Sequence, residues 1–236
     1  MLSRDEEREL MAVVESTERL KTGIEGLDEL IEGGLIKGDI HLLAGGPGTG
    51  KTIFASNLVY NAAKDLALKS VYATFEESAE SFRQNMKSIG ISFAPLESSN
   101  LVSIVDLDAV RGKELESNIS LLLAAVKDAR ANILVVDSLT ALLLACETPF
   151  ELRTFVKSLY RSLKQMKVTT LMTVSLGQNE RIGAEAFICD SVMLLENWLD
   201  EDRFKTRFMV LKMRGTEHSR KYHSVILTPK LKISNY

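Results

Sequence analysis

The sequence predicts an α/β fold in which one mostly parallel sheet lies between two layers of helices. Apolar, strand-like runs alternate with amphipathic, helix-like runs through most of the chain. The C-terminal part then holds several strand-like runs with few helical residues between them. Alternating strands and helices are typical of a parallel sheet, whereas consecutive strands pair antiparallel. We therefore expect a three-layer sheet that becomes antiparallel at its C-terminal edge.

Hydrophobic spacing locates the individual elements. The run from Ile133 to Val136 is apolar throughout, which is typical of a central strand covered on both faces. Pro149 fits the first turn of a helix that runs to Lys167. The other predicted helices cover residues 4–20, 52–64 and 114–130 and a segment around Phe82 and Met86. The other predicted strands cover residues 40–44, 70–75, 101–105, 168–174, 191–195, 206–213, 224–227 and 231–233.

Length and composition favour one domain with a large core. Of the 236 residues, we expect 1–20 to form an acidic helical extension and 21–236 to form the domain. No apolar run reaches the ~18 residues needed to cross a bilayer. The charged N-terminal stretch lacks the apolar centre of a signal peptide, so we expect a cytoplasmic protein without membrane contact. Cys146 and Cys189 are far apart in sequence, which favours free thiols over a disulfide or metal site.

Charge is distributed unevenly along the chain. The net charge is −3, yet nine Lys and Arg residues and one acid, Glu217, lie between Arg203 and Lys232. Such an excess indicates contact with something negative: a nucleotide phosphate, an acidic neighbour or nucleic acid. A solvated basic face is the alternative.

The segment from Gly45 to Thr52 predicts a phosphate-binding loop. It reads Gly-Gly-Pro-Gly-Thr-Gly-Lys-Thr and fills every fixed position of the pattern G-x-x-x-x-G-K-[ST]. Glycines let backbone N–H groups approach phosphate oxygens, and the N-terminus of the following helix favours anions. An ordinary glycine-rich turn is the alternative, but the required strand and helix flank this one.

The loop pattern also assigns roles. Lys51 is expected to contact the β- and γ-phosphates, and the Thr52 hydroxyl to bind Mg²⁺. The predicted nucleotide-binding residues of this region are Gly46, Pro47, Gly48, Thr49, Gly50, Lys51, Thr52 and Phe54.

Carboxylates follow two of the predicted strands. Asp137 ends a buried strand, where a carboxylate needs a partner, and a metal ion bound beside the phosphate loop provides one. Glu76 and Glu77 end the strand after the loop helix and point to opposite faces in an extended chain. We favour Glu76 as the base that activates water and retain Glu77 as a second candidate. The alternative is that both glutamates begin a helix and favour its dipole.

Two cations, Lys212 and Arg214, lie two residues apart on a predicted strand and therefore on one face. They suit a γ-phosphate, either of their own chain or of a neighbouring subunit. The alternative is an edge strand whose cations discourage pairing with other chains. His218 lies close to them in sequence, with a nucleotide-binding role or a structural one left open.

Taken in order, these motifs resemble the KaiC family within the RecA/RadA superfamily of P-loop ATPases. The matching segments are Thr22-Gly23-Ile24-Glu25-Gly26-Leu27-Asp28, the loop 45–52, Phe75-Glu76-Glu77-Ser78, Val135-Val136-Asp137-Ser138-Leu139-Thr140 and Lys212-Met213-Arg214-Gly215-Thr216-Glu217-His218. The resemblance extends from Lys21 to about Ile233 and implies a RecA-like P-loop NTPase fold.

The resemblance also implies features that spacing alone does not show. Members are usually hexameric rings with ATP between protomers. Glu76 and Glu77 match the family's catalytic glutamates, and Lys212 and Arg214 match residues that reach the neighbour's γ-phosphate, with His218 near that interface. The chain departs from the clock protein in having one such domain instead of two, so an autokinase role is not carried over. It also has Ser175 where the family often has a glutamate.

The sequence therefore predicts a Mg²⁺-dependent, homo-oligomeric ATPase whose catalytic residues are Lys51, Glu76, Glu77, Lys212 and Arg214. Thr52 and Asp137 are the predicted metal ligands. One alternative is a RadA-like recombination accessory protein, in which the basic C-terminal segment binds single-stranded DNA. The other is a nucleotide-controlled signalling scaffold that contacts a protein partner through its N-terminal helix.

Overall fold

The computed structural model describes residues 18–107, 113–146, 148–177, 182–183, 185–228 and 230–234. Its main sheet contains β3 (Ile40–Gly45), β4 (Ser70–Thr74), β5 (Val102–Asp106), β6 (Ile133–Asp137), β7 (Thr169–Ser175), β8 (Ser191–Asp200), β9 (Arg203–Met213), β10 (His223–Ile226) and β11 (Lys232–Ser234). Within the described residues these nine strands pair in the order β11-β10-β9-β8-β3-β7-β6-β4-β5. Six adjacent strands of this order run parallel to one another: β8, β3, β7, β6, β4 and β5. The strands β9, β10 and β11 each pair antiparallel with their neighbours. The predicted three-layer sheet with antiparallel C-terminal strands is confirmed.

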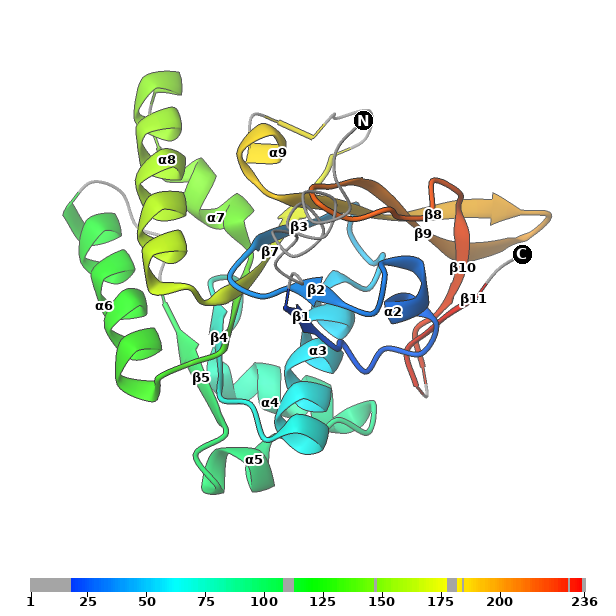
Figure 1. Ribbon diagram of the computed structural model, residues 1–236, viewed down its shortest axis with the longest axis horizontal. Coiled ribbons are helices and arrows are strands. Elements are labelled where there is room, and N and C mark those ends of the chain that lie inside the picture. The colour runs from blue at the N-terminus through cyan, green and yellow to red at the C-terminus, as the bar shows by residue number, and fades with distance from the viewer. Residues whose placement is uncertain are drawn as a thin grey trace, which may run out of the picture.

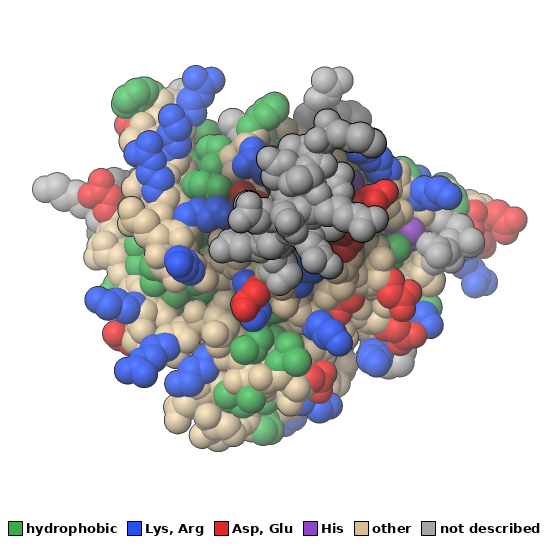
Figure 2. All heavy atoms as spheres, viewed as in Figure 1, with side chains coloured by type: hydrophobic (Ala, Val, Ile, Leu, Met, Phe, Trp, Pro, Cys, Tyr) green, Lys and Arg blue, Asp and Glu red, His purple; other side chains and the backbone are tan. Residues whose placement is uncertain are grey.

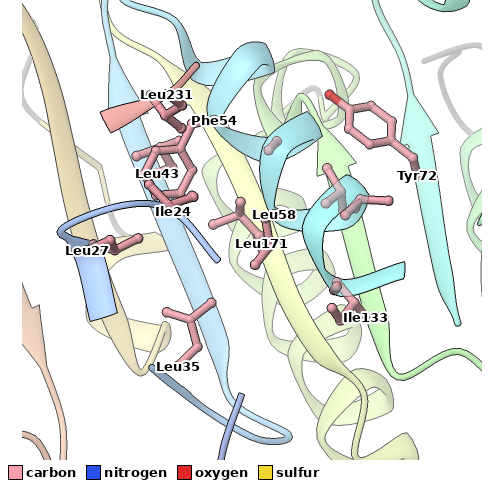
Figure 3. Packing of buried hydrophobic residues seen from close by; sticks show 14 of the residues in the cluster. Ile24, Leu27, Leu35, Leu43, Phe54, Leu58, Tyr72, Ile133, Leu171 and Leu231 are labelled. Atoms are coloured by element: carbon pink, nitrogen blue, oxygen red, sulfur yellow. The ribbon is translucent and has the colours of Figure 1, made fainter. Parts of the chain in front are cut away.

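Helices cover both faces of this sheet (Figure 1). They are α2 (Leu27–Leu30), α3 (Lys51–Leu66), α4 (Ala79–Ser88), α5 (Ala94–Ser98), α6 (Lys113–Ala129), α7 (Leu139–Leu144), α8 (Pro149–Met166) and α9 (Glu185–Ile188). Residues of α2 to α5 pack into one hydrophobic cluster, and residues of α6 to α8 pack into a second cluster on the opposite face. In Figure 3 the first cluster fills the space between α3 and the strands, with Leu58 beside Leu171 and Phe54 beside Leu43.

Local sequence explains where the main helices begin. The Ser78 hydroxyl accepts a hydrogen bond from Ser81 N at the start of α4, and Thr148 does the same for Glu151 N at the start of α8. The helix α3 starts directly after Gly50, whose φ of 92° lies in the left-handed region. The phosphate loop therefore leads into the N-terminus of α3 without an intervening turn.

The hairpin β8–β9 extends beyond the rest of the sheet (Figure 1). The strand β3 ends at Gly45, opposite Leu195, but β8 continues to Asp200. Both strands of the hairpin are longer than the segments 191–195 and 206–213 that hydrophobicity predicts, because their outer parts carry polar residues.

The N-terminal prediction needs one correction. Arg19 and Leu20 form the strand β1 (Arg19–Leu20), which pairs antiparallel with β2 (Leu35–Ile36), so a helix does not extend to Leu20. The rest of that predicted helix, residues 4–17, lies outside the described residues. Over the described ranges, no helix is long and apolar enough to cross a membrane.

Candidate functional site

The phosphate loop joins the carboxyl end of β3 to the N-terminus of α3. The Lys51 ammonium donates hydrogen bonds to Gly45 O at 2.8 Å and Gly46 O at 3.0 Å. Burial lowers the pKa of Lys51, while the charges of Asp137 and Glu76 act in the opposite direction. The lysine thus lies in the mouth of the loop, next to two carboxylates.

The remaining loop residues line this mouth in different ways. Pro47 and Gly48 are exposed, and nothing lies within 4 Å of the position that a Cβ on Gly48 would occupy. Thr49 is buried, and its hydroxyl donates to Gly46 O at 2.9 Å. Thr52 is half-buried in the first turn of α3. The backbone of the loop is therefore open to solvent on one side, where an anion would bind.

Phe54 does not belong to this opening. Its side chain is 1% exposed and stacks on Phe208, with ring centroids 6.0 Å apart. Figure 3 shows it among the buried residues beside Leu43 and Leu231. Helical spacing thus turns the Phe54 side chain toward the core, and the predicted nucleotide-binding role of Phe54 stays a prediction.

Asp137 ends β6, next to the loop. The residue is 8% exposed, and its carboxylate accepts hydrogen bonds from Tyr72 OH and Thr173 Oγ1, each at 2.6 Å. These neutral donors come from β4 and β7, on the two sides of β6. They orient the carboxylate without themselves adding a compensating charge, which suits a metal-binding residue.

Glu76 and Glu77 lie in different surroundings. The Ser138 hydroxyl donates a short hydrogen bond to Glu76 Oε1. Glu77 turns toward α4, where its carboxylate accepts a hydrogen bond from Asn85 Nδ2 at 2.8 Å. The structure brings Glu76 to the group of Lys51 and Asp137 and leaves Glu77 outside it.

Lys212 and Arg214 lie at the opposite end of the sheet from the phosphate loop. Arg214 N donates to Asp190 O, and Asp190 N donates to Ile40 O at the first residue of β3. The loop follows the last residue of β3, Gly45, five residues further along, or about 16 Å.

Both side chains contact the segment 186–190. Lys212 Nζ donates to Ala186 O at 3.0 Å and to Cys189 O at 2.6 Å, and Arg214 Nη2 donates to Phe187 O at 3.1 Å. Burial, followed by repulsion from Arg214, lowers the pKa of Lys212. The two cations share one face, as predicted, but they do not converge with Lys51.

His218 makes a local contact, between its Nδ1 and Ser219 O at 3.1 Å. Its neighbour Ser219 donates its backbone N–H to Leu30 O, so this turn packs beside α2. The structure does not bring His218 to the phosphate loop of its own chain.

Acidic neighbours compensate much of the basic C-terminal segment. Six of its nine cations lie within 4.0 Å of a carboxylate, all from outside the segment: Arg203 with Asp202, Lys205 with Asp200, Arg207 with Glu196, Arg214 with Asp190, and Lys230 and Lys232 with Glu25. In Figure 2, Lys/Arg and Asp/Glu side chains are accordingly intermixed over the β9–β11 side of the molecule. Of the predicted partners, an acidic neighbour within the same chain is the one that the contacts support.

Several residues of the site were missed by sequence reasoning. Tyr72 and Thr173 fix Asp137, Ser138 fixes Glu76, and Thr140 Oγ1 accepts a hydrogen bond from Ser175 N at 2.7 Å. The strand β7 (Thr169–Ser175) carries three threonines, so the sequence alone does not single out Thr173. Asp106 accepts a hydrogen bond from Ala79 N at the start of α4.

The donor set fits Mg²⁺ better than a metal held entirely by protein. Within the described residues, no group of three or more His, Cys, Asp or Glu side chains is placed to bind a metal. Mg²⁺ usually keeps several waters and takes one or two carboxylates plus substrate phosphates. The Thr52 hydroxyl and the Asp137 carboxylate match this requirement. The described thiols, Cys146 and Cys189, are free, as predicted.

Comparison with known proteins assigns these features to one family. The family profile "ATPase: KaiC" matches residues 20–234. The circadian clock oscillator protein KaiC of Parasynechococcus marenigrum is 32% identical over 212 residues, which cover 85% of this chain and 41% of the relative. The chain thus spans less than half the length of this clock protein.

Two proteins of Pyrococcus horikoshii match over nearly their whole length. A UPF0273 protein is 33% identical over 234 residues, covering 91% of this chain and 92% of the relative. The crystal structure of a KaiC-like protein superimposes with a TM-score of 0.84 and 33% identity, covering 92% of this chain and 99% of that chain.

Proposed function

The chain belongs to the KaiC ATPase family, and on that premise we propose that it hydrolyses Mg²⁺-ATP at a boundary between two subunits. One observation carries the proposal. Lys51, Asp137 and Glu76 meet at one end of the sheet, whereas Lys212 and Arg214 lie at the other end.

The first group supplies the binding and water-activating half of the site. The loop N–H groups and Lys51 bind the phosphates, and Thr52 and Asp137 would hold Mg²⁺, which when bound neutralises charge on the β- and γ-phosphates. Glu76 orients and deprotonates the attacking water. Its Oε1 is held by Ser138, which leaves Oε2 to accept the proton.

The second group supplies cations for charge that develops in the transition state. In their own subunit these cations are separated from the phosphate loop by the length of β3. A second copy of the chain could be placed so that the end of its sheet that carries Lys212 and Arg214 faces the first copy's phosphate loop. Its cations would then reach the γ-phosphate bound by the first copy. A hexameric ring, the usual assembly of this family, repeats that contact around a closed circle.

The assignment of the loop is tested by Lys51→Ala, which should abolish ATP turnover. Lys64→Ala is the matched control, because Lys64 lies in the last turn of the same helix and contacts the ring of Tyr60. Turnover by Lys51→Ala at the parent rate would refute the ATPase assignment.

The shared site is tested by mixing two inactive variants. Glu76→Gln lacks the water-activating base but retains its cations, and Arg214→Ala lacks a cation but retains its loop and base. Recovered activity on mixing requires that one subunit complete the other's site. If the mixture stays as inactive as its components, the cations act within their own subunit or not at all.

Binding of single-stranded DNA is the weaker candidate. Its motivation was the basic C-terminal segment, and acidic partners from the same chain lie beside most of those cations. Salt-dependent binding of single-stranded DNA would restore this candidate. The scaffold hypothesis depends on the N-terminal residues 1–17, which lie outside the described part of the chain.

A further inference from the structure

We propose that Asp190 is a positioning residue that holds the Arg214 guanidinium ready for the phosphate of a neighbouring subunit. The inference rests on the proposed function, because it assumes that Arg214 acts across a subunit boundary. It extends that function to a residue of the segment between α9 and β8.

The Asp190 carboxylate is itself fixed from several directions. Its side chain is 9% exposed. Oδ2 accepts hydrogen bonds from Ile40 N at 2.9 Å and from the Lys164 ammonium at 2.8 Å. Oδ1 accepts from Tyr160 OH at 3.2 Å. These partners come from the start of β3 and from α8, so the carboxylate is anchored to two elements of the core.

Arg214 is attached to this anchor by its backbone and by its side chain. Its N–H donates to Asp190 O at 3.0 Å, and Nη1 lies 3.6 Å from Asp190 Oδ1. Nη2 donates to Phe187 O at 3.1 Å. A free arginine side chain loses rotamer entropy when it is ordered. In this chain, contacts within the fold order the Arg214 side chain before any ligand binds.

The Arg214 guanidinium retains N–H donors that could bind a phosphate. A guanidinium carries five N–H donors in a planar fork, of which Phe187 O accepts one, while Asp190 lies at ion-pair distance. The Arg214 side chain remains 54% exposed. Such an arrangement suits an arginine that must be oriented before a second subunit brings its phosphate.

The charge on Asp190 persists at neutral pH. Burial opposes ionisation, but the hydrogen bonds from Lys164 and from Ile40 N outweigh it and lower the pKa of this carboxyl. The Lys164 ammonium also contacts Asp39 Oδ1 at 2.5 Å. Asp39 therefore shares the lysine and feels the charge of Arg214, but it makes no hydrogen bond or ion pair with Arg214 among the described residues, which makes it a matched control for the direct contact.

The test places Asp190→Asn separately in each half of the shared site. In the mixed oligomer, the Glu76→Gln subunit donates Arg214, and the Arg214→Ala subunit donates the loop and base. With saturating ATP, Asp190→Asn in the arginine donor should lower kcat by about tenfold. The same change in the loop donor should alter kcat by less than about twofold, since no Arg214 remains there to be positioned. Asp39→Asn should have little effect in either subunit.

Each outcome decides between positioning and a structural role. Asp190 also binds the start of the strand that leads to the phosphate loop, so a purely structural effect would appear in the loop donor. The inference would be overturned if Asp190→Asn lowered kcat equally in the arginine donor and in the loop donor, or in neither. Either result would leave the proposed function intact. Absence of activity in the parent mixture would instead refute the shared site and this inference with it.

A milder variant covers the case in which Asp190→Asn does not fold. Tyr160→Phe removes only the hydroxyl that donates to Asp190 Oδ1. We expect it to lower kcat by about twofold to threefold in the arginine donor alone. A loss confined to the loop donor would contradict the proposal.

Discussion

At the scale of single residues, the site depends on neutral side chains that hold charged ones. Tyr72 and Thr173 are hydrogen-bonded to Asp137, and Ser138 is hydrogen-bonded to Glu76. Neutral donors orient a carboxylate without neutralising it, so its charge remains available to a metal ion or a proton.

Ser138→Ala tests this at Glu76. Removing the hydroxyl frees the glutamate to adopt other rotamers, and we expect kcat for ATP hydrolysis to fall by about tenfold. The KM for ATP should change little, because Lys51 and the loop keep their contacts. Steady-state kinetics measure both constants, with Ser103→Ala on β5 as the control. A raised KM with unchanged kcat would place Ser138 in binding instead.

The buried His41 leads us to expect that the stability of the fold decreases at acidic pH. Burial lowers its pKa from 6.5 to about 4, and its Nδ1 lies 2.7 Å from Ser191 Oγ. The unfolded chain therefore takes up a proton below pH 6.5 that the folded chain refuses until about pH 4. The free energy of unfolding should fall across this window as the pH falls, by up to about 3 kcal/mol.

Urea denaturation at several pH values measures this dependence. In His41→Asn, whose amide reaches the position of Nδ1, the fall between pH 6.5 and pH 4 should be smaller than in the parent. Parallel curves for parent and variant would show that other groups account for the acid sensitivity.

At the scale of elements, the C-terminal strand β11 is attached to the turn before α2. Ile233 N donates to Glu25 O at 2.8 Å, and a Cβ on Gly26 would lie 1.9 Å from Ile233 O. Gly26 also has a φ of 82°, which disfavours any side chain. The glycine is therefore required both by its backbone conformation and by the close approach of β11.

Gly26→Ala should destabilise the fold by about 2–3 kcal/mol, because β11 must move away from the turn. Gly33→Ala is the matched control. Its φ of 97° is equally unusual, but no atom lies within 4 Å of the added Cβ, so only the backbone cost of about 1–2 kcal/mol applies. Thermal unfolding compares the two variants, and equal shifts in Tm would contradict a role for the close approach.

The sequence alone predicts features that depend on one element and its neighbours in the chain, but not contacts between distant elements. The phosphate loop and the buried strand before Asp137 are local patterns, so spacing predicts them well. The contact of Asp190 with Ile40 joins residues 150 positions apart, and no local pattern indicates it. Phe54 adjoins the loop in sequence, but helical periodicity places its side chain in the core, which proximity along the chain does not indicate.

At the scale of the whole molecule, the separation of the two groups of site residues leads us to expect that activity depends on assembly, as the proposed function requires. The position of Arg214 follows from the register of β8 and β9 and from the order of the strands, which sequence periodicity does not determine. Under the proposed function, a subunit with its cations at one end of β3 and its loop at the other end has an incomplete site when alone. We therefore expect assembly to be a condition for catalysis.

This predicts that the ATPase rate per subunit rises with protein concentration. Dilution below the assembly range should reduce the rate toward zero, while Arg214→Ala should stay slow at every concentration. Light scattering on the same samples gives the mass, from one protomer of 26.2 kDa to about 157 kDa for a hexamer. A full rate per subunit at the mass of one protomer would mean that the cations act within their own chain. That result would require the segment 186–190 to release them and β9 to repack.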